Sequence, residues 1–149
     1  MKVAVFLAVF ALAAPLFAQQ PVEEEGSATF RTVDIYVDSK GTPLAAYQIK
    51  ISFTNANVKI VGIEGGEHPA FREPPMYDPK ALQHERAIIA AFNTSSEGQL
   101  PKSKTRVATI HVQASIEGGL QCVLKAQAAA NPDGKRIVVE ATWEERKDK

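Results

Sequence analysis

The sequence predicts an all-β fold, a sandwich or a barrel, built from seven or more short strands. Apolar and polar residues alternate with a period of two along most of the chain, as on strands with one buried face. Clusters of Gly, Pro, Asn, Asp and Ser separate the alternating stretches, as turns do. No convincing long amphipathic helix interrupts this pattern among the 149 residues. Short strands joined by turns, without helices, are typical of sandwiches and barrels.

The N-terminus has the layout of a secretory signal peptide. Lys2 supplies a positive charge, residues 3–17 are almost uniformly apolar, and Ala18 precedes a polar stretch. The apolar stretch is shorter than the roughly 20 residues of a membrane-spanning helix. We expect cleavage after Ala18, a secreted or periplasmic protein, and no membrane span after cleavage. Leu16 at the −3 position is unusual for such a site, and a retained N-terminal anchor is the alternative.

Residues 28–143 are expected to form one domain, between a solvated linker at 19–27 and a charged, frayed tail at 144–149. Three strands are expected in its first half, at residues 29–38, 44–54 and 58–63. Each carries apolar residues at every second position. The first strand should therefore turn Val33, Ile35 and Val37 inward and Tyr36 outward.

The segment 67–83 breaks this rhythm because it contains four prolines, which have no N–H to donate to a central strand. At most it holds a helical turn at 79–84, with Asp78 as N-cap and Pro79 at the first helical position. Long loops on rigid scaffolds are often functional, so this segment is a candidate site.

Four further strands are expected in the second half, at residues 86–93, 105–115, 120–130 and 137–143. The first is mostly apolar and is expected to be buried on both faces or covered by the proline-rich loop. The alanine-rich stretch 125–130 is interpreted as strand, because of its neighbours and the following proline. Asn131-Pro132-Asp133-Gly134 predicts a hairpin turn. Trp143 should face the core with Ile137 and Val139.

Composition excludes several classes of protein. The chain carries no net charge, so it lacks the basic surface that binds nucleic acid or anionic membranes. Cys122 is the single cysteine, so no intrachain disulfide can form, and we interpret it as a small buried hydrophobe. The core alone must stabilise the domain, which is feasible at this length.

No constellation of catalytic residues is present. The three histidines, His68, His84 and His111, do not pair with other ligands at metal-binding spacing. Asp34 and Asp38 lie about 13 Å apart on one strand face, too far to share a calcium ion directly. We therefore expect no catalytic residue, no metal and no cofactor, and a protein that is not an enzyme.

Several strands resemble those of the cohesin family, which belongs to a β-sandwich group shared with some carbohydrate-binding modules. The resemblance covers residues 28–143 and rests on hydrophobic pattern. It is carried by four stretches: 32–38, 44–53, 58–63 and 106–112. It implies a jelly-roll-like sandwich of about nine strands that binds a secreted protein and catalyses no reaction. Cohesins dock dockerins, small calcium-loaded helical modules, through one sheet face. Departures from the cellulosomal pattern leave that partner open: we expect a lone module without a surface-anchoring signal, and the chain carries the proline-rich segment 67–83.

Two binding hypotheses follow. A protein partner, dockerin-like or other, would dock on an outward sheet face, where we place Thr109, His111 and Gln113. The alternative is a polysaccharide stacked on exposed aromatic rings, for which the candidates are Tyr36, Phe71 and Tyr77. Phe71 and Tyr77 have a competing structural explanation, which is that they pin the proline-rich loop to the sheet.

Overall fold

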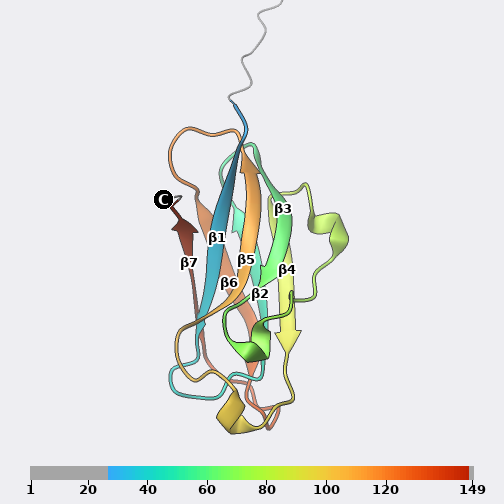
Figure 1. Ribbon diagram of the computed structural model, residues 1–149, viewed down its shortest axis with the longest axis vertical. Helices are drawn as coiled ribbons and strands as arrows, with labels where there is room; N and C mark the ends of the chain where they lie inside the picture. The colour runs from blue at the N-terminus through green and yellow to red at the C-terminus, as the bar shows by residue number, and fades with distance from the viewer. Residues whose placement is uncertain (1–26, 148–149) are drawn as a thin grey trace, which may run out of the picture.

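The fold consists of two antiparallel sheets packed face to face (Figure 1). The computed structural model describes residues 27–147, so the signal peptide and nearly all of the linker lie outside the described residues. The four-stranded sheet has the order β3-β5-β1-β7, and the three-stranded sheet has the order β4-β2-β6. The strands are β1 (Thr29–Asp38), β2 (Ala46–Phe53), β3 (Val58–Gly65), β4 (Arg86–Phe92), β5 (Thr105–Ala114), β6 (Cys122–Ala130) and β7 (Glu140–Arg146).

The expectation of an all-β fold is confirmed, but the expectation of about nine strands is wrong, because residues 27–147 form seven. Two stretches that run beside the three-stranded sheet are reduced to isolated bridges, Met76 with Ala90 and Arg136 with Ala130. Pro74 and Pro75 precede the first bridge and have no N–H with which to extend it. The chain after Arg136 leaves β6 and enters the other sheet as β7.

The core forms between the two sheets, from residues at every second position of each strand. Val33, Ile35 and Val37 of β1 are completely buried, as their alternation predicts. Tyr47, Ile49, Ile51 and Phe53 of β2 meet them from the other sheet. The buried hydroxyl of Tyr47 donates a hydrogen bond to the carbonyl oxygen of Val107, at 3.2 Å, so its burial leaves no unsatisfied donor.

The proline-rich segment contains two short 3-10 helices, η1 (Pro69–Phe71) and η2 (Pro79–Ala81), and a third, η3 (Glu97–Gln99), follows β4. The expected helical turn is confirmed in η2, where Asp78 Oδ1 accepts a hydrogen bond from the Lys80 N–H at 2.9 Å. Backbone hydrogen bonds from Ile60 to His84 and from Gln83 to Ile60 join the end of the segment to β3. The segment therefore closes one side of the sandwich.

The end of the chain differs from expectation in its boundary. Ile137, Val139 and Trp143 pack against the core, as predicted, but β7 continues to Arg146, so the expected frayed tail at 144–149 is wrong for its first three residues. Each of these three charged residues of β7 has an oppositely charged partner elsewhere in the four-stranded sheet or beside it. Glu144 pairs with Lys104, Glu145 with Arg31, and Arg146 with Asp34.

β4 also differs from expectation. Ala87 and Ile89 face the core, whereas Ile88 and Phe92 are exposed. The expectation that this strand is buried on both faces or covered by the proline-rich loop is wrong, because the loop reaches β4 only at its edge, through Met76 and η2. The alanine-rich end of β6 is a strand, as predicted, paired with β2.

Candidate functional site

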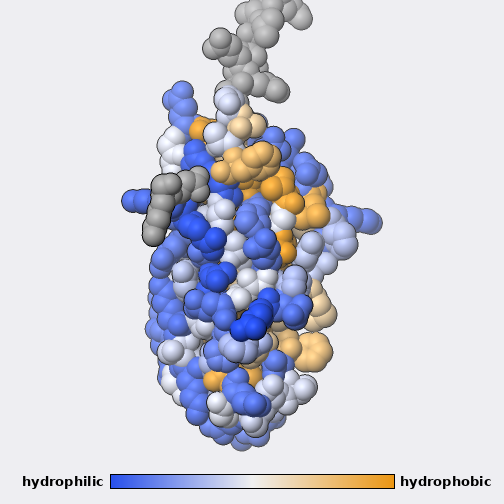
Figure 2. Space-filling model, viewed as in Figure 1, coloured by the Kyte–Doolittle hydropathy of each residue, from blue (hydrophilic) through white to orange (hydrophobic). Residues whose placement is uncertain are grey.

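A network of hydrogen-bonded charged side chains covers part of the outer face of the four-stranded sheet. Asp34 is central to it: its carboxylate accepts hydrogen bonds from Arg146 Nη2 at 2.6 Å, Arg146 Nε at 3.1 Å and Thr109 Oγ1 at 2.9 Å. Arg106 Nη1 donates to Thr109 Oγ1 at 2.7 Å. Figure 2, which views this sheet from outside, shows a largely hydrophilic surface, with apolar side chains gathered mainly toward one end.

Thr109, His111 and Gln113 lie on this outer face, as their alternation in β5 predicts, since Ala108, Ile110 and Val112 are buried. Thr109 is nevertheless only 1% exposed, because the network covers it, and an accessible contact at Thr109 is therefore a wrong expectation. The His111 ring lies over Gly62, and its Nε2 is 3.3 Å from Glu64 Oε1, without the alignment of a hydrogen bond.

Tyr36 lies on the same face, with one side of its ring occupied. The ammonium of Lys104 is 4.6 Å from the ring centroid, and Glu144 holds that ammonium at 2.9 Å. Burial, and then the negative charge of Asp34, raise the pKa of the Tyr36 hydroxyl. A sugar could stack on that side of the ring only after displacing Lys104.

The aromatic residues of the proline-rich segment point inward. Phe71 is 2% exposed and packs edge-on against Tyr47, with ring centroids 5.3 Å apart. Tyr77 is partly buried against the core. The structural explanation holds for both residues: they pin the loop to the sandwich. The expectation that Phe71 is open to a ligand is wrong, because burying this ring is what anchors a loop that cannot pair as a strand.

The outer face of the three-stranded sheet carries more exposed apolar side chains than that of the four-stranded sheet, on whose strands Phe30 is the exposed large apolar residue. Four large apolar residues on it or at its edge are between 46% and 67% exposed: Met76, Ile88, Phe92 and Val123. Single exposed apolar residues are common on protein surfaces, whereas several on one face mark sites of contact. Sequence reasoning missed this face. The available signal was the alternation of Ile88, Ala90 and Phe92, which was interpreted as burial on both sides.

Small side chains form a hollow of about 420 Å³ on this face. We call it the alanine trough and define it by Ala46, Ala90, Ala128 and Ala130. The register places Ala46 between Phe92 and Ala130, and Gln48 between Ala90 and Ala128, so the trough crosses all three strands. Met76 and Phe92 border it on the β4 side and Arg136 on the β6 side. Its lining is mostly apolar and offers shape and hydrophobic contact.

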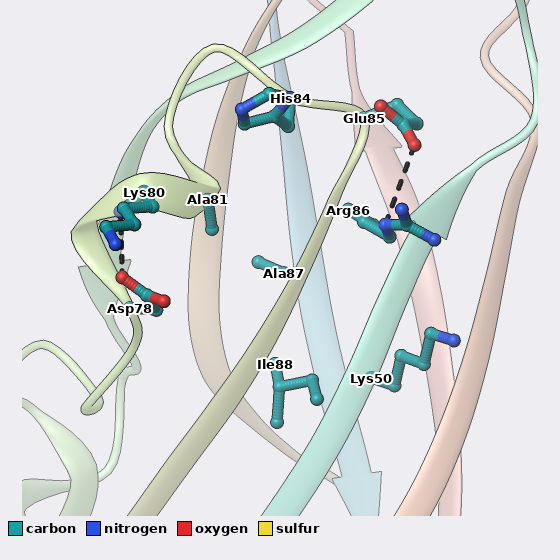
Figure 3. A pocket seen from close by; sticks show the side chains of 9 residues that line it. All are labelled: Lys50, Asp78, Lys80, Ala81, His84, Glu85, Arg86, Ala87 and Ile88. Carbon is teal, nitrogen blue, oxygen red and sulfur yellow. Dashed lines mark hydrogen bonds and ion pairs between the residues drawn. The ribbon is translucent and has the colours of Figure 1, made fainter.

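A second hollow, of about 650 Å³, lies between η2 and β4 (Figure 3). Three of its charged groups have structural partners: Asp78 caps η2, and Glu85 Oε1 lies 3.7 Å from Arg86 Nε. Figure 3 shows Lys50 and Arg86 on neighbouring strands, near Ile88. This hollow extends the basic and apolar character of the same face toward the β4 edge.

Two further groups bear on chemistry. Burial raises the pKa of the Cys122 thiol to about 11, so it stays protonated at neutral pH. Within residues 27–147 no group of three or more His, Cys, Asp or Glu side chains is placed to hold a metal ion. In that same part of the chain, no helix is both long enough and apolar enough to cross a membrane.

Comparison with known protein families, with curated proteins and with solved structures finds no match to this chain.

Proposed function

We propose that this chain is a secreted, non-enzymatic binding module of cohesin-like type, which docks a protein partner on the outer face of its three-stranded sheet. The observation that carries the proposal is that four large apolar residues, Met76, Ile88, Phe92 and Val123, are exposed on or beside that face. Apolar surface left in water is unfavourable by about 25 cal/mol per Å², so a partner that covers it gains affinity. Exposed apolar clusters rimmed by polar residues are typical of interfaces.

The contrast between the two outer faces supports this choice. On the four-stranded sheet, Asp34, Thr109, Arg106 and Arg146 satisfy one another, so a partner there would have to replace bonds that already exist. The alanine trough has few polar groups to desolvate. Docking on the three-stranded sheet therefore has the lower cost. The polysaccharide alternative has less support, because Phe71 is buried and Lys104 covers one side of Tyr36.

The test is a pull-down with the mature domain, residues 19–149, as bait and the secreted and envelope fraction of the source as prey, with and without calcium. Two matched variants place an arginine on each outer face: Ala90→Arg in the trough and Gln113→Arg on β5. We expect one protein to be retained by the parent and by Gln113→Arg, and lost with Ala90→Arg. Loss with Gln113→Arg alone would move the interface to the other sheet, and retention of no protein would reject docking. Calcium dependence would identify a dockerin-like partner.

A further inference from the structure

Two lysines lie side by side on the outer face of the three-stranded sheet without a counterion. Lys50 of β2 and Lys125 of β6 are register partners. Like charges directly opposite one another destabilise an antiparallel pair. No carboxylate of residues 27–147 lies within 4.0 Å of either ammonium. The domain therefore carries a repulsion that its own residues do not relieve.

Two further basic residues lie on or beside this face. Arg86 of β4 lies near Lys50, with the exposed Glu85 as its acidic neighbour (Figure 3). Arg136 borders the alanine trough, and its guanidinium reaches only a backbone oxygen, that of Gln127, at 2.7 Å. At the end of the other sheet, Lys40 and Lys104, which adjoin β1 and β5, each lie within 3.2 Å of a carboxylate.

We propose that the partner of this face is an acidic protein segment, which places apolar side chains in the alanine trough and carboxylates over Lys50 and Lys125. This inference rests on the proposed docking function and adds the chemistry of the partner. Ala46 in the trough and Lys50 are four residues apart on β2, which is about 13 Å along a strand. The partner therefore presents its apolar contact and its acidic pair about 13 Å apart.

Two other occupants fit the face less well. A second copy of this chain, docked about a two-fold axis through the lysine pair, would bring that pair against itself in a partly dehydrated interface. An acidic polysaccharide would satisfy the lysines, but in the trough its hydroxyl groups would find only Gln48 and Arg136 among mostly apolar side chains. A protein segment supplies both the apolar and the acidic part.

The experiment is a selection of random 20-residue peptides, displayed on phage, against the immobilised domain. Selected peptides are then synthesised, and their affinities are measured by fluorescence anisotropy for the parent and three variants. Lys125→Glu reverses one charge of the pair and gives Lys50 a cross-strand partner. Lys59→Glu is the matched control on the outer face of the other sheet, and Ala90→Arg fills the trough. Thermal unfolding followed by circular dichroism establishes that each variant is folded.

We expect peptides rich in Asp and Glu that also carry apolar residues, with an affinity that falls about tenfold in Lys125→Glu, the size of one lost charge-assisted contact. The affinity should also fall with added salt, and stay unchanged in Lys59→Glu. A different result would overturn the acidic partner and leave the docking function standing. In that result the peptides lose affinity for Ala90→Arg, but they are not rich in Asp and Glu and bind Lys125→Glu as tightly as the parent. A selection without any peptide that depends on Ala90 would overturn both. Binding of polygalacturonate to the immobilised parent domain, lost in Lys125→Glu and with no peptide enriched, would reassign the face to polysaccharide.

Discussion

The Asp34 network offers a direct test of what holds the last strand in place. Replacing Asp34 with Asn preserves volume and removes the negative charge on which Arg146, Arg106 and Thr109 converge. The amide oxygen of Asn can still accept the hydrogen bond from Thr109. The substitution removes the ion pair with Arg146, which joins β1 to the C-terminal end of β7.

The magnitude follows from burial and geometry. A hydrogen bond to a charged group contributes roughly 1.5–3 kcal/mol, and Arg146 makes two to Asp34. The Arg146 side chain is 49% exposed while that of Asp34 is 11% exposed, so solvent screens the pair from one side only. We expect Asp34→Asn to lower the free energy of unfolding by about 2 kcal/mol, and Arg146→Gln by about 1 kcal/mol because its own head group is half in water.

Urea unfolding followed by the fluorescence of Trp143, the only tryptophan, measures both changes. The double variant completes a thermodynamic cycle, in which a direct pair gives a coupling of about 1 kcal/mol. Gln113→Arg on the same face but outside the network serves as control and should change stability by less than about 0.5 kcal/mol. An Asp34→Asn effect below about 0.5 kcal/mol, or additive single effects, would refute the reasoning.

Three further predictions concern other parts of the molecule. Phe71→Ala should lower the free energy of unfolding by about 3–5 kcal/mol, as for buried aromatic residues elsewhere, whereas a solvent-exposed ring would give almost no change in the same urea measurement. The raised pKa of Cys122, about 11, means that the folded state holds its proton more tightly than the unfolded chain. Stability should therefore fall as pH rises from about 9 to 11, and fall less in Cys122→Ala, where Tyr36 and Tyr47, whose pKa values burial also raises, still contribute. Lys125→Glu should raise stability by about 0.2–1 kcal/mol, because it replaces repulsion of Lys50 with attraction. A lower midpoint of thermal unfolding would contradict the repulsion.

The sequence by itself determined the secondary structure, because strand formation depends on local alternation. Val33, Ile35 and Val37 face the core simply because side chains of a strand point to alternate sides. The same rule predicted that Thr109, His111 and Gln113 point outward. Asp78 could be predicted as the N-cap of η2 because this contact joins residues that are neighbours in sequence.

Only the tertiary structure decided which outer face carries paired charges and which carries exposed apolar side chains. Asp34 and Arg146 are 112 residues apart in sequence, and only the pairing of β1 with β7 brings them together. Lys50 and Lys125 likewise become neighbours only through the pairing of β2 with β6. Alternation assigns a residue to a side of its own strand, but it carries no information about which strands adjoin. Long-range strand pairing decides whether the charged side chains of a face are paired and whether its alanines are exposed. The location of the candidate site therefore depends on the tertiary structure.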